Sequence, residues 1–424
     1  MLKRTVRYPF LTEQKEKILS NLVSAKEIRL KSIDGKTFID AISGLWNVIL
    51  GYNNIYINNA IKEQLDSLPF VNLWSNTHDV IEKVAKKLID FTNHRYTELI
   101  YSTTGSETVE LAIKVARKYQ AVKKENRKKY IVSFNLSYHG TSYVTMSLTD
   151  IDKEYLEDIG VSDYGIAVLP FFKKGDDLEF YIKKIGRFFE LNYNKIAAVV
   201  IEPVLGVGGV LLYEQEIIEL LQSVADMYDI LIISDEITTG FFRTGNFLGY
   251  EIYNNFSPDL ICLSKGITNG YLPLGVVMLN EKVGDVLKNE VIPHFSTQNG
   301  NLCAMAAANA LLSLLNKENI KKNNLEKGRY LYQKMLSLEK CSKFSIEVRY
   351  IGMMFSIDIR SIEDSKKLTF DKVWEIFRKI KEKGLITYPF ATPQNSGILL
   401  LPAYTTDYKD LDEISHILND EFLG

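Results

Sequence analysis

The chain has few of the features that mark specialised protein classes. Its three cysteines, Cys262, Cys303 and Cys341, are too few and too scattered for a disulfide framework or a zinc site, so we expect a reducing, cytoplasmic environment and no metal. The formal net charge of −2 leaves no electrostatic footprint for nucleic acid or for an anionic membrane. The sequence contains neither an internal repeat nor a low-complexity tract. These absences favour an ordinary globular protein.

Long apolar runs are also missing. The most apolar stretch, residues 196–212, is interrupted by Glu202, Pro203 and three glycines, which excludes a membrane helix. The basic residues near Met1 are not followed by an apolar segment, and we therefore expect no secretion signal. With 424 residues, the chain exceeds the size at which a single core stops growing. We expect two domains, or one large domain with a smaller one attached.

A lysine stands close behind a short apolar run. Leu260–Leu263 is predicted to be a buried strand, and Lys265 follows it, just before Gly266. Lysine is almost never fully buried without a partner, so this side chain either extends to solvent or takes part in chemistry. Burial would lower its pKa and expose a neutral amine that attacks carbonyl carbons. The glycine behind it lets backbone approach whatever the lysine carries.

A second apolar run, Ile230–Ile233, leads into the acid Asp235. Strands that alternate with helices form parallel sheets whose ligands lie at the carboxyl ends of the strands, so Asp235 and Lys265 can face one pocket. An acid and an amine together suit pyridoxal phosphate, which forms a Schiff base with a lysine while an acid partners its ring nitrogen. A simple Asp–Lys salt bridge at the sheet edge is the alternative.

The turn at Gly105 and Ser106 is a candidate anion site. Residues 99–102 predict a strand and residues 108–119 a helix, so the turn presents backbone N–H groups at a helix N-terminus. A helix cap without a ligand is the alternative. After the predicted strand 130–134, the loop carries Tyr138 and His139. This aromatic pair either stacks on a flat cofactor or lies at the surface.

The remaining pattern predicts two structural units. Residues 11–30 indicate a helix and then a strand, and Asp34-Gly35 indicates a hairpin turn. Strands alternate with helices from residue 79 to an alanine-rich helix at 304–315, whereas smaller units after residue 317 suggest an α+β arrangement. The glycines from Gly206 to Gly209 precede an apolar segment and not a helix, which argues against a dinucleotide-binding loop. We expect segments at 1–75, 76–316 and 317–424, with the first and last forming the smaller domain.

With these residues in view, the chain resembles the class III aminotransferases, pyridoxal-phosphate enzymes of fold type I, over nearly its whole length. The resemblance implies an α/β fold with a large domain, whose mostly parallel sheet lies between helices, and a smaller α+β domain. Within the family the chain is most similar to the ω-aminotransferase (amine:pyruvate) branch. The matches occur in family order and are Gly44-Leu45-Trp46, Thr104-Gly105-Ser106-Glu107, Tyr138-His139-Gly140, Glu202-Pro203, Asp235-Glu236 with Thr239–Gly245, Ser264-Lys265-Gly266, and Thr297 before Gly300-Asn301.

The resemblance implies a role for each matching position. Lys265 would hold pyridoxal 5′-phosphate and move the substrate proton, and Asp235 would pair with the pyridinium nitrogen. Thr297 of the partner subunit would contact the phosphate, which implies a homodimer or a tetramer built from dimers. Trp46 would line the substrate pocket. The resemblance also places Gly105 and Ser106 on the cofactor phosphate, and Tyr138 and Ile237 on the two faces of the cofactor ring. It includes His139 and Glu202 among the cofactor-binding residues.

Smaller differences indicate the branch. Relatives that act on ornithine, acetylornithine or GABA usually carry a glutamate in the loop after Glu-Pro, whereas here that loop has Val207 between two glycines. The chain also departs from the common family pattern at Phe242, where glycine is usual, and at Leu302, where proline is usual. Both differences could reshape the pocket without touching the chemistry.

Many relatives grip the substrate α-carboxylate with an arginine near the C-terminus, but no arginine occurs here after Arg378. Arg243 is the candidate replacement, although its family position suggests a structural role. With Trp46, Tyr388 and Phe390 as an apolar wall, we expect ping-pong transfer from an amine or ω-amino donor to a keto acid or aldehyde. An aminomutase, racemase or decarboxylase on the same scaffold, or a non-catalytic cofactor-binding paralogue, is the alternative.

Overall fold

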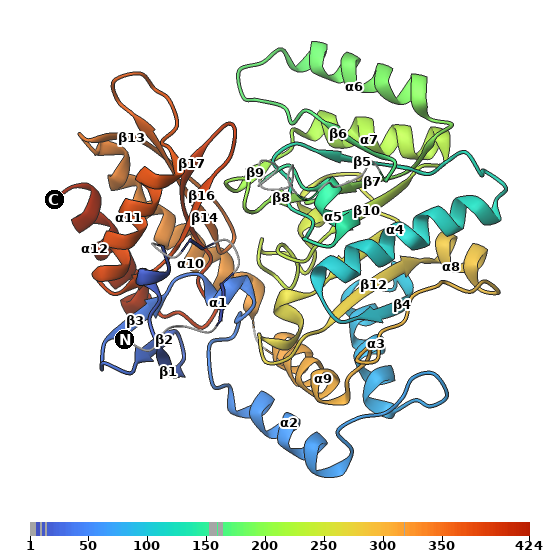
Figure 1. The fold of residues 1–424 in the computed structure, drawn as a ribbon, viewed down its shortest axis with the longest axis horizontal. Helices are drawn as coiled ribbons and strands as arrows, with labels where there is room; N and C mark the ends of the chain where they lie inside the picture. The colour runs from blue at the N-terminus through green and yellow to red at the C-terminus, as the bar shows by residue number, and fades with distance from the viewer. Residues whose placement is uncertain (1–5, 9–10, 13–14, 152–158, 160–163, 318) are drawn as a thin grey trace.

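The structure is a computed structural model that describes residues 6–8, 11–12, 15–151, 159, 164–317 and 319–424. Figure 1 shows two units, one built on a large sheet and the other on smaller sheets formed by segments from the N-terminal and C-terminal parts of the chain. Within the described residues, no helix is both long and apolar enough to cross a membrane.

The large unit is organised by a seven-stranded sheet with the order β4-β12-β11-β10-β7-β5-β6. β12 runs antiparallel to both of its neighbours, while the other adjacent strands pair in parallel. Helices cover both faces of the sheet (Figure 1). The strands are β4 (Tyr96–Ser102), β5 (Tyr130–Phe134), β6 (Ile166–Leu169), β7 (Ile196–Ile201), β10 (Leu231–Asp235), β11 (Leu260–Leu263) and β12 (Gly275–Asn280).

The central strands are buried along their whole length. Every residue of β7, β10 and β11 is buried, as their unbroken apolar runs predict for strands covered on both faces. Because β12 is antiparallel to both β4 and β11, these two strands point the same way as β5, β7 and β10. The loops that follow all five strands therefore emerge at one edge of the sheet. The helices of this unit are α3 (Asp79–Phe91), α4 (Gly105–Val122), α5 (Tyr143–Leu148), α6 (Leu178–Asn192), α7 (Gln215–Tyr228), α8 (Glu281–Leu287) and α9 (Leu302–Lys317), with the 3₁₀ turns η4 (Gly249–Ile252) and η5 (Lys265–Thr268).

The smaller unit joins the two ends of the chain. β3 pairs in parallel with β15, so Ile39 lies opposite Leu385, and the mixed arrangement agrees with the predicted fold class. A second sheet, β13-β14-β17-β16, is antiparallel and packs with the helices near the C-terminus (Figure 1). The segment boundaries at residues 75 and 316 stay a prediction. The elements are η1 (Lys15–Ile18), β1 (Leu22–Lys26), β2 (Arg29–Ser32), β3 (Thr37–Asp40), α1 (Ser43–Trp46), α10 (Ile320–Met335), η6 (Leu336–Lys340), β13 (Phe344–Ile351), β14 (Met354–Ser361), α11 (Phe370–Glu382), β15 (Leu385–Ile386), β16 (Tyr388–Ala391), β17 (Ser396–Leu400) and α12 (Tyr408–Phe422). The helix α2 (Ile55–Ser67) packs instead against α9 of the large unit (Figure 1).

Two local expectations differ from the structure. The region 11–30 contains only the short η1 turn and then two strands, where a helix and one strand were expected. Helix α4 begins at Gly105, earlier than the expected start at residue 108, because Thr104 caps it by accepting a hydrogen bond from the Glu107 amide. The glycine-rich segment after β7 is a hairpin of β8 (Val204–Leu205) and β9 (Leu211–Leu212), in agreement with the rejection of a dinucleotide loop.

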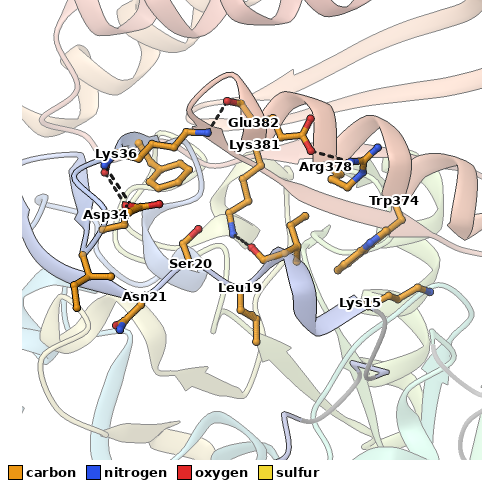
Figure 2. A pocket seen from close by; sticks show the side chains of 14 residues that line it. Lys15, Leu19, Ser20, Asn21, Asp34, Lys36, Trp374, Arg378, Lys381 and Glu382 are labelled. Atoms are coloured by element: carbon orange, nitrogen blue, oxygen red, sulfur yellow. Dashed lines mark hydrogen bonds and ion pairs between the residues drawn. The ribbon is translucent and has the colours of Figure 1, made fainter. Parts of the chain in front are cut away.

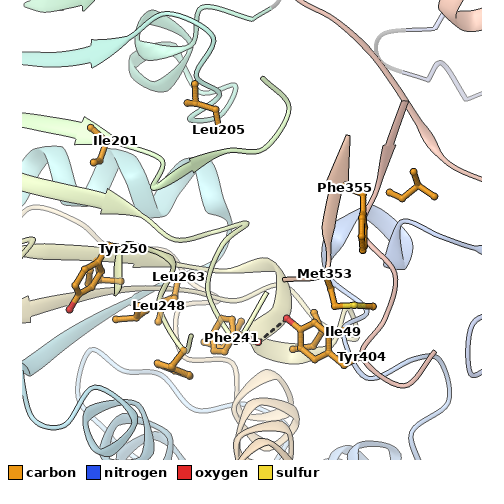
Figure 3. Packing of buried hydrophobic residues seen from close by; sticks show 14 of the residues in the cluster. Ile49, Ile201, Leu205, Phe241, Leu248, Tyr250, Leu263, Met353, Phe355 and Tyr404 are labelled. Carbon is orange, nitrogen blue, oxygen red and sulfur yellow. Dashed lines mark hydrogen bonds between the residues drawn. The ribbon is translucent and has the colours of Figure 1, made fainter. Parts of the chain in front are cut away.

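One apolar core runs through both units. Figure 3 shows Phe241, from the loop after β10, beside Tyr404, from the segment before α12. The Tyr404 hydroxyl donates to the Phe241 carbonyl at 2.8 Å, and the Tyr404 amide donates to the Ile49 carbonyl at 2.8 Å. Met353 and Phe355 of the smaller unit belong to the same buried cluster. This joint sets the smaller unit against the edge of the sheet where the loops emerge.

Candidate active site

Lys265 lies at the loop edge of the sheet, in the turn that follows β11. Its Nζ donates to Thr238 Oγ1 at 2.6 Å and lies 4.7 Å from the centroid of the Trp46 ring. Burial lowers the pKa of Lys265 to about 8, although the negative charges of Asp235 and Glu202 act in the opposite direction. At pH 7 roughly a tenth of the Lys265 side chains would therefore carry a neutral amine, far more than for an ordinary lysine.

Asp235 is bonded to a histidine and not to the lysine. Asp235 Oδ2 lies 2.8 Å from His139 Nδ1, and Asp235 Oδ1 accepts from the Ile237 amide at 3.2 Å. Asp235 nevertheless acts on Lys265 through its charge. The structure thus brings the predicted acid and amine to one site without the Asp–Lys salt bridge that was the alternative.

Glu202 lies behind this pair and joins two loops. It accepts from the Tyr138 amide at 2.8 Å and from the Gly206 amide at 3.3 Å, so it connects the loop after β5 to the hairpin after β7. Burial raises the pKa of Glu202 to about 7, with a further rise from Asp235 and an opposing effect of His139. The acid therefore holds the backbone beside the predicted stacking residue.

The predicted anion turn opens helix α4. Gly105 and Ser106 form the first turn, whose backbone N–H groups point away from the helix without intrahelical acceptors. The Thr141 amide donates to Ser106 Oγ at 3.1 Å, and a Cβ on Gly140 would lie only 2.4 Å from that oxygen. A Cβ on Gly105 would lie 3.2 Å from the Ile237 side chain. Glycine at these positions lets the loop after β5 and the Ile237 side chain pack closely against the helix end, whose first N–H groups are suited to binding a phosphate.

Trp46 is held beside Lys265 by a strained loop. Its backbone has φ of +69°, a conformation that bulky residues rarely adopt. Asp40 holds this loop by accepting from the Gly44 amide at 2.6 Å and from the Tyr52 hydroxyl at 2.7 Å. The Trp46 ring is 4% exposed and meets Tyr388 edge-on at 5.4 Å. The predicted apolar wall of Trp46, Tyr388 and Phe390 belongs to one buried cluster with Val210 and Leu399.

Two predicted residues lie elsewhere. Arg243 is 1% exposed and donates to the Pro402 carbonyl at 2.6 Å and to the Met353 carbonyl at 3.3 Å, with its guanidinium 4.8 Å from the Tyr404 ring centroid. Thr297 lies in an exposed part of the loop between α8 and α9. Arg243 thus fastens the two units together, and Thr297 is available to a second chain.

Thr238 and Asp40 were missed by the sequence reasoning. Thr238 accepts a hydrogen bond from the Lys265 amine, and Asp40 stabilises the Trp46 loop by accepting a hydrogen bond from the Gly44 amide. Thr238 stands three residues after Asp235, but nothing in the sequence distinguishes it from the neighbouring Thr239, whose hydroxyl bonds Glu236 instead. Asp40 stands at the end of a predicted strand, which is a weak signal shared with many acids.

An open cleft of about 550 Å³ lies in the smaller unit, between residues 15–21, residues 32–38 and α11. Figure 2 shows that the ammonium groups of Lys36 and Lys381 in this cleft are hydrogen-bonded to backbone carbonyls. Lys36 Nζ donates to the Glu382 carbonyl at 2.6 Å, and Lys381 Nζ donates to the Ile18 carbonyl at 2.7 Å. None of the predicted site residues lines this cleft, so it is separate from the Lys265 site.

The residues around Lys265 fit pyridoxal phosphate. They combine a partly neutral amine, a buried acid and a helix N-terminus for the phosphate. Among the described residues, His139 Nε2 and Trp46 Nε1 are buried without a hydrogen-bond partner, so both remain able to bond a polar ligand. When bound here, the cofactor supplies an electron sink that stabilises negative charge on a substrate carbon.

Known proteins resemble the chain over almost all of its length. The family model of class-III aminotransferases matches residues 10–422. The adenosylmethionine-8-amino-7-oxononanoate aminotransferase of Helicobacter pylori is 28% identical over 91% of this chain and 88% of that protein. The structure of an amine transaminase from an uncultivated Pseudomonas species, in its PLP-bound form, is 27% identical with a TM-score of 0.91 and covers 99% of both chains. An (S)-enantioselective omega-transaminase from Thermomicrobium roseum is 27% identical with a TM-score of 0.90, over 98% of this chain and 96% of that one.

The family match and the site agree with each other. The match spans both units of the fold, and the matching lysine, acid and helix N-terminus meet at one edge of the large sheet. The chain therefore belongs to the class-III aminotransferases, enzymes that transfer amino groups with pyridoxal phosphate.

Proposed function

We propose that this aminotransferase is an ω-transaminase, which takes its amino group from a donor without an α-carboxylate and passes it to a keto acid or aldehyde. The observation that carries the proposal is the apolar wall of Trp46, Tyr388 and Phe390, in a chain that has no arginine after Arg378. Arg243 is fastened to two backbone carbonyls through Nη1, and its Nε and Nη2 atoms are buried without a partner, so Arg243 is the arginine that a carboxylated donor would have to recruit. An arginine–carboxylate pair is bidentate, and its absence costs a carboxylated donor about 2–5 kcal/mol.

The site residues divide the work of transamination. Lys265 would hold the cofactor and would move the substrate proton. Its lowered pKa suits the second task, because the neutral amine can accept a proton near neutral pH. Thr238 orients that amine through its hydroxyl. Asp235, itself positioned by His139, keeps the ring nitrogen protonated. Gly105 and Ser106 would hold the phosphate, and Tyr138 and Ile237 would cover the two faces of the ring.

The apolar wall favours an uncharged substituent on the donor. Trp46 and Phe390 are almost fully buried, and Tyr388 packs edge-on against Trp46. A carboxylate placed against this wall would lose its hydration without gaining a charged partner. An alkyl or aryl group would instead be buried favourably, at about 25 cal/mol per Å².

We also propose that the enzyme is a cytoplasmic homodimer. Trp74 is 80% exposed and meets Phe295 edge-on at 5.8 Å, and Leu65 and Val291 are 53% and 81% exposed. Such large exposed apolar side chains support contact with a second copy of the chain. Thr297 lies on the same loop as Phe295, which suits a role in the partner's site. The three buried free cysteines support a reducing compartment.

The deciding experiment compares benzylamine with phenylglycine, its α-carboxylated analogue, as donors to pyruvate. We expect kcat/KM to favour benzylamine by at least roughly tenfold. Adenosylmethionine belongs in the same panel, because it appears in the name of the Helicobacter pylori relative. A clear preference for phenylglycine would refute the proposed donor class, and sedimentation of the protein as an active monomer would refute the dimer.

A further inference from the structure

The β8–β9 hairpin, with its loop Gly206–Val210, lies between the Lys265 site and the smaller unit. On its inner side, the Gly206 amide donates to Glu202 at 3.3 Å. A Cβ on Gly206 would lie 3.3 Å from the Thr238 methyl group and 3.8 Å from the Trp46 ring. The loop therefore touches the two side chains that contact the Lys265 amine.

The outer side of the same loop is fastened by two side chains of the smaller unit. Asn395 Nδ2 donates to the Gly208 carbonyl at 2.9 Å, and Arg349 Nε donates to the Gly209 carbonyl at 3.1 Å. A Cβ on Gly209 would lie 2.6 Å from Asn395 Nδ2 and 3.2 Å from Arg349 Nη2. The backbone of the loop is thus in close contact with both groups, and only glycine fits there.

Both fastening groups are themselves held in place. Arg349 Nη2 pairs at 3.1 Å with Asp358, whose side chain is 1% exposed, and Arg349 Nη1 pairs with Glu347 at 3.0 Å. Asn395 is 4% exposed, and its backbone N–H donates to Thr392 Oγ1 at 3.1 Å. These contacts orient the two donors toward the loop before any substrate arrives.

The loop needs such support because its backbone is strained. Val210 has φ of +55°, a left-handed conformation that a β-branched residue rarely adopts without support from its surroundings. Inside the turn, the Gly206 carbonyl alone accepts from both the Gly209 amide at 3.1 Å and the Val210 amide at 3.3 Å, while β8 and β9 pair over only two residues each. Without outside contacts, the turn would relax and Gly206 would move relative to Trp46 and Thr238.

We propose that Arg349 and Asn395 are positioning residues that clamp the Gly206–Val210 loop against Trp46 and Thr238 and thereby set the width of the substrate side of the pocket. This inference rests on the proposed role of Lys265 and of the wall beside it. It assigns the selectivity for donor size to hydrogen bonds made by the smaller unit on the far side of the loop.

The test compares Arg349→Gln with Arg360→Gln. Arg360 Nε lies 3.3 Å from the same Asp358 carboxylate, and Arg360 donates to the Gln394 carbonyl instead of to the loop. The control variant therefore removes a charged partner of the same buried acid and leaves both donors to the loop in place, although the Gln394 carbonyl beside Asn395 also loses its bond to Arg360. Asn395→Ala removes the other donor and serves as the second variant if Arg349→Gln fails to fold.

Two measurements are made on the cofactor-loaded enzyme. Hydrogen exchange at the backbone amides of residues 208–210 should become about tenfold faster in Arg349→Gln and in Asn395→Ala, and stay within about twofold of the parent in Arg360→Gln. The ratio of kcat/KM for 1-phenylethylamine to that for isopropylamine should change by at least about fivefold in the two clamp variants only.

The outcomes separate the clamp from the proposed function. Unchanged exchange in both clamp variants overturns the clamp. Faster exchange with an unchanged donor ratio shows that the loop does not set pocket width and overturns the inference. An equal effect of Arg360→Gln assigns the change to loss of charge at Asp358 and also overturns it. If the parent enzyme uses neither amine, the proposed donor class fails. The hydrogen-exchange rates of residues 208–210 in the parent and the variants still decide whether the clamp exists, because they need no substrate.

Discussion

The two sides of the active site are built in different ways. On the sheet side, Lys265, Asp235 and Glu202 each stand at or just after the end of a strand of one sheet. On the wall side, Trp46 and Tyr388 come from opposite ends of the chain, and the loop between them and the sheet is fastened from the smaller unit. The sheet side holds the groups needed for the chemistry, while the wall side contains what selects the donor. Changes on the sheet side should therefore abolish turnover, and changes on the wall side should alter selectivity.

The largest effect is expected for Lys265→Ala. Loss of the amine should lower turnover on the order of 10⁵-fold, because neither cofactor attachment nor proton movement has another amine close by. Mass spectrometry after borohydride reduction measures this directly, with attachment expected only in the parent. Lys128→Ala is the control, since that lysine binds the Tyr228 carbonyl far from the chemistry. A borohydride-fixed adduct in Lys265→Ala would show that the assignment is wrong.

Asp235→Asn should lower kcat by roughly 10³-fold while the cofactor stays bound, because the carboxylate charge that protonates the ring nitrogen is removed. Cofactor content by absorbance and turnover are measured together. Asp259→Asn is a matched control, since Asp259 is another buried acid beside the same sheet and accepts from the Ile232 amide at 2.9 Å. Near-normal turnover of Asp235→Asn would remove the proposed role of the acid.

The pH dependence of cofactor capture tests the sheet side without any substrate. Only the neutral amine attacks the aldehyde, and burial lowers the pKa of Lys265 to about 8, so the neutral fraction grows as pH rises through that value. Stopped-flow absorbance of the apoprotein mixed with cofactor should show a rate that rises roughly 25-fold from about pH 6.5 to about pH 8.5 and then levels off. A rate that still rises steeply above about pH 9.5 would indicate an ordinary lysine pKa.

Asp40→Asn should give the smallest effect, and it acts on the wall side. The variant loses one oxygen that accepts from the Gly44 amide and the Tyr52 hydroxyl, which should cost about 2 kcal/mol of stability and loosen the Trp46 loop. We expect KM for benzylamine to rise about fivefold with kcat little changed. Asp34→Asn, in the exposed hairpin turn, is the control. A fall in kcat with unchanged KM would mean that Asp40 belongs to the sheet side.

Backbone strain also occurs in the loop after β10, at one of the two departures from the pattern that the family resemblance implies. Phe242 has φ of +69° at a position where that pattern has glycine. Its ring packs edge-on against Phe91 at 6.1 Å and Phe247 at 5.6 Å. The aromatic contacts compensate for a backbone conformation that glycine would adopt without cost. The sequence shows phenylalanine in place of glycine at this position. Whether this replacement stabilises or destabilises the fold depends on neighbours that are distant along the chain.

The sequence by itself determined the sheet side of the site. Continuous apolar runs predict buried parallel strands, and the carboxyl ends of such strands meet at one edge, so the lysine, the acid and the helix N-terminus could be placed together from local patterns. The direct hydrogen-bond partners of these groups could not be predicted from the sequence. The choice between Thr238 and Thr239 as the acceptor for Lys265, for example, depends on the direction of a hydroxyl group, which no local pattern encodes.

Only the tertiary structure decided the wall side. Trp46, the Gly206–Val210 loop, Tyr388 and Arg349 are separated by long stretches of chain. The loops that carry Trp46 and Val210 have positive φ values that local preference disfavours. Such conformations persist only where distant groups impose them, here the Asp40 carboxylate and the Arg349 and Asn395 side chains. The pairing of β3 with β15 brings those groups to the sheet edge, and this long-range contact has no signature in either segment alone.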